Sequence, residues 1–200
     1  LARPTHMNTS WDMARFEVVA HKWADISQPN YGVAIINDCK YGHRIHDNLI
    51  SLNLLRSPKS PDPDADMHVH EFRYALMPHP RDHIAAQVPQ RAYEFNVPAR
   101  AVKTLPQRGP TPASYSLMTV DASNVFIDTV KKSEDGRDMI LRCYEAHGID
   151  CTTKINFSFS IREVDEVDIL EDNGRSLPLR NNQVKLTFSP FEIKTLRVRN

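Results

Sequence analysis

Apolar and polar residues alternate along most of the chain with a period of two. The clearest run covers residues 155–161 (INFSFSI), where every odd position is apolar and every even position is polar. Because successive side chains of a strand point to opposite faces, this pattern predicts a strand with one buried and one wet face. Similar runs predict about eleven strands, at residues 16–23, 31–36, 48–55, 69–77, 93–97, 115–120, 125–130, 139–144, 155–161, 184–188 and 193–198.

No stretch of ten or more residues keeps the apolar stripe of an amphipathic helix. The short strands are separated by turns rich in Pro, Asn, Asp and Gly, which is typical of β-sandwiches. The pattern therefore predicts an all-β protein.

A proline-rich stretch divides the chain. Residues 98–112 hold four prolines and little periodicity, and proline neither donates to a strand ladder nor continues a helix. We therefore expect a first domain over residues 1–97, a linker over 98–112 and a small terminal β-sandwich over 113–200. The first domain begins abruptly at Leu1, without a Met or a leader segment, which suggests a slice of a larger sheet from a longer or processed protein.

Composition and charge exclude several classes of function. The chain has 200 residues, with 25 basic and 25 acidic side chains that cancel. This balance excludes the broad positive field of a general binder of nucleic acid or anionic membranes. No apolar run approaches the ~20 residues of a membrane helix, and no glycine-rich phosphate loop of a nucleotide-binding protein is present.

The odd number of cysteines favours a reducing compartment. Cys39, Cys143 and Cys151 cannot all pair, so a cytoplasmic protein is expected. A Cys143–Cys151 bridge is the alternative if the protein is secreted.

Histidines suggest one metal hypothesis. His68 and His70 share a strand face, and His79 and His83 follow, so neutral imidazoles there could chelate zinc. Their spacing matches no familiar zinc signature, and solvated or hydrogen-bonded histidines are the expected alternative. We assign no metal ligand.

Residues 37–42 (NDCKYG) form the strongest candidate for a binding loop. They follow an apolar strand and combine Asn, Asp, Lys and Tyr, the side chains that hydrogen-bond sugar hydroxyls. A plain turn is the alternative. No Ser-His-Asp or Cys-His arrangement is apparent, and spacing alone cannot select a carboxylate pair for glycoside chemistry. We therefore assign no catalytic residue.

Several segments resemble one enzyme family: residues 3–12 (RPTHMNTSWD), 37–42 (NDCKYG), 51–62 (SLNLLRSPKSPD), 70–72 with 74–79, and 186–192 (LTFSPFE). They are similar, in the same order, to the C-terminal region of the class II α-mannosidases of glycoside hydrolase family 38. The nearest branch is the cytosolic and vacuolar one.

This resemblance implies a fold and a parent enzyme. The chain would be the end of a large, supersandwich-like β-sandwich followed by the small terminal one. A catalytic domain N-terminal to it would hold zinc (or cobalt) and the nucleophile of a retaining glycosidase acting on terminal α-linked mannose. The chain alone would be inactive. Its expected partners are that domain and a mannose-containing oligosaccharide, in a homo-oligomer of the parent, with a vacuole or lysosome as the alternative location.

The resemblance also selects candidate substrate-proximal residues. In this family a loop of the large sandwich approaches the sugar, and residues 37–42 are the candidate. Asp38 would accept from a sugar hydroxyl, and Lys40 or Tyr41 would donate to one. Trp11 offers an apolar face to a sugar ring, or packs in a core or domain interface. The alternatives to an enzyme part are a freestanding carbohydrate-binding module and a purely structural interaction module.

Overall fold

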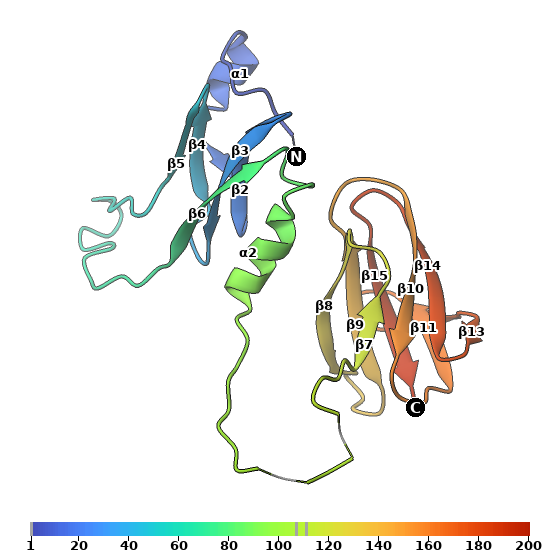
Figure 1. Ribbon diagram of the computed structural model, residues 1–200. Helices are drawn as coiled ribbons and strands as arrows, with labels where there is room; N and C mark the ends of the chain where they lie inside the picture. The colour runs from blue at the N-terminus through green and yellow to red at the C-terminus, as the bar shows by residue number, and fades with distance from the viewer. Residues whose placement is uncertain (1, 107, 111) are drawn as a thin grey trace. The chain divides into compact units, whose positions relative to one another are not determined.

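The computed structural model describes residues 2–106, 108–110 and 112–200. Residue 1 of the predicted first domain and residues 107 and 111 of the predicted linker lie outside the described residues. The chain divides into two compact units, residues 1–104 and 105–200, which we describe separately (Figure 1). The described residues of the predicted linker are all exposed and belong to neither helix nor strand.

The described part of the first unit contains two small antiparallel sheets. In the first sheet β3 lies between β2 and β6, and in the second β4 lies between β1 and β5. The elements are β1 (Val18–Val19), β2 (Trp23–Gln28), β3 (Tyr31–Asn37), β4 (Gly42–His46), β5 (Leu49–Leu52) and β6 (Tyr74–Pro80). Because β3 belongs to the first sheet and β4 to the second, residues 38–41 connect the two sheets.

Two helices complete the described first unit. The short α1 (Ser10–Ala14) begins with a capping box between Thr9 and Asp12. The longer α2 (Val88–Asn96) packs against β2 and β3 and carries a proline in its first turn, where a missing N–H costs nothing. The strand predicted at residues 93–97 is therefore wrong. Both helices of the described chain, five and nine residues long, are far too short to span a bilayer.

The second unit is a β-sandwich of two antiparallel sheets (Figure 1). One sheet has the order β13-β14-β10-β7 and the other the order β12-β11-β15-β9-β8. The strands are β7 (Met118–Val120), β8 (Val125–Lys132), β9 (Met139–Glu145), β10 (Cys151–Phe157), β11 (Glu163–Val167), β12 (Arg175–Ser176), β13 (Leu179–Arg180), β14 (Gln183–Phe188) and β15 (Ile193–Arg199).

The core of the second unit follows from strict alternation on its central strands. In β10 the residues Thr153, Ile155 and Phe157 are buried and the residues between them are not. Ile155 lies opposite Val184 of β14, which is also fully buried. Buried residues of both sheets join in one cluster: Val125, Leu141, Cys143, Ile155, Phe157, Ile161, Val164, Val184, Leu186, Phe188, Leu196 and Val198. The predicted all-β, sandwich-type fold is confirmed.

Candidate functional site

Asp38, in the segment between β3 and β4, is held by a residue distant in sequence. Oδ1 of Asp38 accepts a hydrogen bond from the backbone N–H of Arg73, and Oδ2 accepts one from Arg73 Nε, both at 3.0 Å. The backbone N–H of Asp38 in turn donates to the Arg73 carbonyl at 3.2 Å. The backbone hydrogen bond and the guanidinium together lower the pKa of Asp38 to about 2. Asp38 is therefore an ionised clamp that ties the loop to the residue before β6.

The neighbouring residues fix the rest of the loop. Oδ1 of the buried Asn37 accepts from the backbone N–H of Lys40 at 2.8 Å, and Asn96 of α2 donates to the Asn37 carbonyl at 3.1 Å. At the far end, His43 is fully buried with its Nδ1 3.3 Å from the Tyr41 carbonyl, and burial lowers its pKa. The conformation of residues 37–43 is thus set by contacts on both sides.

Lys40 and Tyr41 carry the polar groups that this scaffold presents. Lys40 Nζ lies 5.0 Å from the centre of the Phe72 ring, a cation–π contact, and the Tyr41 ring lies 4.6 Å from that of His21. Among the described residues, neither the ammonium of Lys40 nor the hydroxyl of Tyr41 has an ion pair or a hydrogen bond. Both therefore remain available as donors.

The structure brings three of the four predicted residues together and leaves the fourth apart. Asp38, Lys40 and Tyr41 share one loop, whereas Trp11 lies on α1 with 74% of its surface exposed. Within the described chain Trp11 makes no ring contact with this loop. The sequence analysis missed Arg73 and Asn96. No local pattern predicts their hydrogen bonds, because Arg73 is 35 positions from Asp38 and Asn96 is 59 positions from Asn37.

The loop can bind hydroxyl groups, but it shows no catalytic arrangement. A fixed carboxylate accepts hydrogen bonds, an ammonium and a phenol donate them, and a tyrosine ring offers an apolar face. Cys39 is the one thiol of the described loop, and its only base partner there is the Asp38 carboxylate. Cys39 is exposed, but its hydrogen bond to the Asp38 carboxylate raises its pKa, so its thiol is protonated at neutral pH.

The histidines of the metal hypothesis have other contacts. His79 Nε2 lies 2.8 Å from Asp25 Oδ1, and both side chains are almost fully buried. His70 Nε2 lies 2.9 Å from the Asp66 carbonyl, and His83 stacks on Trp23. Among the described residues, no group of three or more His, Cys, Asp or Glu side chains is placed to hold a metal ion. The three cysteines are free thiols, so the alternative Cys143–Cys151 bridge is not formed.

Comparison with known protein families gives two matches in the same family. Residues 1–64 match the model described as "Glycosyl hydrolases family 38 C-terminal domain". Residues 124–196 match the model described as "Glycosyl hydrolases family 38 C-terminal beta sandwich domain". The chain belongs to glycosyl hydrolase family 38. The candidate loop lies inside the first matched segment, and the sandwich core lies almost entirely inside the second.

Individual relatives agree with this assignment. The chain is 47% identical over 98% of its length to "Alpha-mannosidase 2C1" from Homo sapiens, and 35% identical over 98% to "Alpha-mannosidase" from Saccharomyces cerevisiae. It spans 19% and 20% of these two relatives. Among solved structures, an α-mannosidase from Enterococcus faecalis superposes with a TM-score of 0.74 at 19% identity, covering 98% of this chain and 22% of that one. The predicted resemblance to the C-terminal region of the α-mannosidases is confirmed.

Proposed function

We propose that this chain is the non-catalytic C-terminal β-sandwich portion of a zinc-dependent, retaining α-mannosidase that removes terminal α-linked mannose from oligosaccharides. The observation that carries the proposal is the 47% identity, over 98% of the chain, to a relative named as an α-mannosidase. The zinc ion and the nucleophile belong to the catalytic domain of the same polypeptide. The described donor groups of this chain do not fit a metal ion. In our proposal its residues support the catalytic domain and help to position the substrate.

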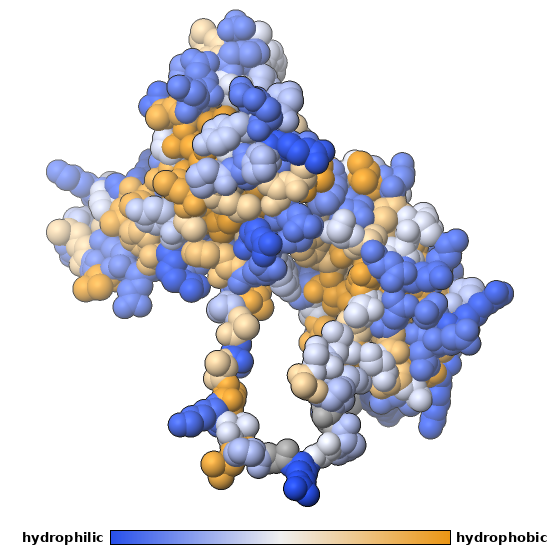
Figure 2. Space-filling model, viewed as in Figure 1, coloured by the Kyte–Doolittle hydropathy of each residue, from blue (hydrophilic) through white to orange (hydrophobic). Residues whose placement is uncertain are grey.

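The support role rests on apolar surface left open by the first unit. Tyr74 and Leu76 lie on one face of β6 and are 55% and 66% exposed. Phe16 and Val19 near β1 are also exposed, and Figure 2 shows orange, apolar side chains in view over this unit. Large apolar side chains left exposed together mark an interface. In the parent enzyme the catalytic domain covers it.

The loop of residues 37–43 is the part of this chain nearest to the substrate in our proposal. Lys40 and Tyr41 donate hydrogen bonds to hydroxyls of the bound oligosaccharide. Asp38 positions the loop through its two hydrogen bonds from Arg73, and its oxygens keep lone pairs that accept from a substrate hydroxyl. The proposal places the enzyme in the cytoplasm, which the free thiols support.

Activity measurements separate this chain from its parent. The purified 200-residue chain should not hydrolyse an aryl α-mannoside, whereas the full-length parent should do so and release α-mannose first, as seen by NMR of the anomeric proton. Turnover by the isolated chain would overturn the non-catalytic role. A parent that is inactive on α-mannosides, or that releases β-mannose first, would overturn the reaction.

Variants of the full-length parent test the loop. Lys40→Met and Tyr41→Phe should each raise KM for an oligosaccharide by about tenfold, the effect of losing one good hydrogen bond. Arg44→Met, on the exposed side of β4, is the matched control and should leave KM unchanged. Unchanged KM in the first two variants would remove the loop from the substrate site.

The freestanding carbohydrate-binding module remains the rival, favoured by the exposure of Trp11. It predicts saturable binding of a mannoside by the isolated chain, lost in Trp11→Ala, together with weak binding of a hydrophobic dye. Our proposal predicts strong dye binding by the isolated chain and no saturable binding of a mannoside. Saturable mannoside binding that is lost in Trp11→Ala would favour the rival, whatever the dye result.

A further inference from the structure

The outer face of the β13-β14-β10-β7 sheet carries an unusual pair of charges. Along β10 the exposed Thr152 and Lys154 alternate with buried residues, and along β14 the exposed Lys185 and Thr187 do the same. In the strand register Lys154 lies directly opposite Lys185, and Thr152 lies opposite Thr187. Two ammonium groups are therefore presented side by side on one face of the sandwich.

Neither ammonium of this pair has an ion-pair partner in the described chain. Like charges directly opposite one another destabilise an antiparallel sheet, because their Cβ atoms are only about 4.5–5.5 Å apart. Neither ammonium forms an ion pair or a hydrogen bond with any described residue. Arg180, on the same face of β13, also has no ion pair among the described residues. The nearby acid, Asp121, accepts a hydrogen bond from Asn156 Nδ2 at 2.8 Å.

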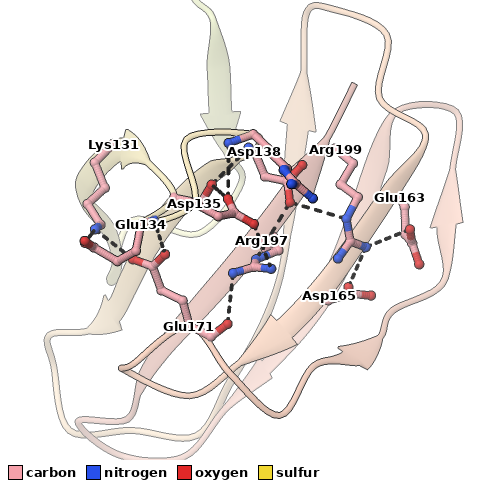
Figure 3. Close-up of polar contacts among 11 residues, drawn as sticks. Lys131, Glu134, Asp135, Asp138, Glu163, Asp165, Glu171, Arg197 and Arg199 are labelled. Carbon is pink, nitrogen blue, oxygen red and sulfur yellow. Dashed lines mark hydrogen bonds and ion pairs between the residues drawn. The ribbon is translucent and has the colours of Figure 1, made fainter.

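The opposite sheet of the same unit handles its cations differently, as Figure 3 shows. Arg199 Nη1 lies 2.7 Å from Glu163, its register partner, and 2.7 Å from Asp165. Lys131 Nζ lies 2.7 Å from the buried Glu171. Arg199 and Lys131 thus have carboxylate partners on this outer face, whereas Lys154 and Lys185 have none among the described residues on the other. A charge pair without its counterion indicates that the counterion comes from outside the chain.

A groove lies at this pair. It has a volume of about 270 Å³ and is lined by Asp121, Ala122, Thr152, Thr153, Lys154 and Lys185. This volume accommodates a phosphate group with a small organic substituent. The ammonium groups donate charge-assisted hydrogen bonds, which are shorter and stronger than neutral ones, and the Thr152 hydroxyl adds a donor.

We infer that this groove binds a phosphate group between Lys154 and Lys185. The anion relieves the repulsion between the two ammonium groups, and Arg180 adds to the local positive potential. Asp121 lies on the same groove and faces the organic substituent, where its carboxylate accepts from a hydroxyl. The ligand is either free inorganic phosphate or a phosphate monoester of a polyhydroxy compound.

An NMR titration of the isotopically labelled 200-residue chain tests the inference. Inorganic phosphate and a hexose 6-phosphate are added separately near neutral pH, with potassium chloride at matched ionic strength as the reference. Saturable shifts of amide signals at residues 121–122, 152–154 and 185 are expected with phosphate and not with chloride. Tighter binding of the hexose phosphate would identify an ester as the ligand, and equal or weaker binding would identify the free ion.

Charge variants complete the test. Lys154→Gln combined with Lys185→Gln should weaken phosphate binding by about tenfold or more. Lys132→Gln, an exposed lysine on β8 away from the groove lining, should leave it unchanged. Lys154 and Lys185 are both exposed. Replacing them removes the repulsion between their ammonium groups, so the double variant should not destabilise the chain. No saturable shift, the same shifts with chloride, or equal loss in the control variant would overturn the inference.

Discussion

The second unit closes a continuous apolar core between two sheets, whereas the first unit leaves comparable side chains uncovered. In residues 105–200 the buried apolar residues of both sheets join in one cluster. In residues 1–104 the described buried apolar residues are Pro89 and six aliphatic residues: Ala24, Ala34, Ile35, Ile36, Val88 and Ala92. Three of these six are alanines, which contribute little buried area. The second unit buries a core of its own, whereas in our proposal the first unit is completed by the catalytic domain of the parent enzyme.

The contrast between the two units shows that alternation of apolar and polar residues predicts a strand, but not whether its apolar face is buried. β6 and β10 alternate in burial in the same way, yet Leu76 of β6 is 66% exposed and Ile155 of β10 is fully buried. The difference lies in what faces each strand. A second sheet covers β10, whereas nothing in the described chain covers this face of β6. Burial is therefore a property of the assembly, and the parent α-mannosidase is the assembly in our proposal.

The largest expected difference in stability is between truncating an apolar side chain in the second unit and truncating one in the first. Phe188→Ala deletes a fully buried ring and should lower the free energy of unfolding of the second unit by about 3–5 kcal/mol. Leu76→Ala deletes an exposed side chain and should change stability by less than about 0.5 kcal/mol. Urea unfolding followed by NMR signals from each unit measures both. A cost for Leu76→Ala equal to that for Phe188→Ala would break the comparison.

A smaller effect is expected at Glu145, a buried carboxylate at the end of β9. Its oxygens accept from the backbone N–H groups of His147, Gly148 and Phe191 and from Asn124. Burial opposes ionisation, but these hydrogen bonds outweigh it and lower the pKa of Glu145. Glu145→Gln should therefore cost the second unit about 2–3 kcal/mol, because a charged acceptor is replaced and at least two N–H groups lose their partner.

The lowered pKa of Glu145 also determines how its contribution to stability changes with pH. Because the folded pKa of Glu145 lies below its unfolded value of about 4.3, its stabilisation is present above that pH and is lost as the pH falls through the folded pKa. The variant should therefore lose part of this acid sensitivity. Glu163→Gln, in an exposed ion pair with Arg199, is the control and should cost less than about 1 kcal/mol. Equal costs at both positions would contradict this account of Glu145.

The smallest effect is expected in the first unit, at the Asp38 clamp. The pKa of Asp38 is lowered to about 2, so its contribution is present above its unfolded pKa and is lost between pH of about 4 and 2. Asp38→Asn should flatten that part of the stability profile, by less than Glu145→Gln does because the pair with Arg73 is partly solvated. Both tryptophans, Trp11 and Trp23, lie in this unit, so intrinsic tryptophan fluorescence follows it selectively. An unchanged acid profile would show that the clamp does not stabilise the unit.

Much of the fold could be predicted from local pattern. The runs at residues 31–36, 125–130, 139–144, 184–188 and 193–198 all lie on strands, because each alternates or is continuously apolar between turn residues. β11 escaped prediction because acids occupy most of its positions, although Asp165 is buried and paired with Arg199. Residues 93–97 alternate by chance, and the signal for α2 was Pro89 in the first turn with Val88 and Ala92 four positions apart.

Less of the candidate site could be predicted. The composition of residues 37–42 correctly indicated a polar loop after a strand, with Asp38, Lys40 and Tyr41 together. The hydrogen bonds from Arg73 to Asp38 require the register of β3 against β6, which no local pattern contains. The phosphate groove was also invisible, because Lys154 and Lys185 become neighbours only when β10 pairs with β14.

Hydrogen exchange of the isolated 200-residue chain tests the contrast between the units most directly. Amides of β10 and β14 should exchange only through global unfolding of the second unit. Amides of β3, the central strand of its sheet in the first unit, should exchange orders of magnitude faster, because so little apolar surface is buried there. Equal protection of β3 and β10 in the isolated chain would contradict the account, since it would show that the first unit is complete without a partner.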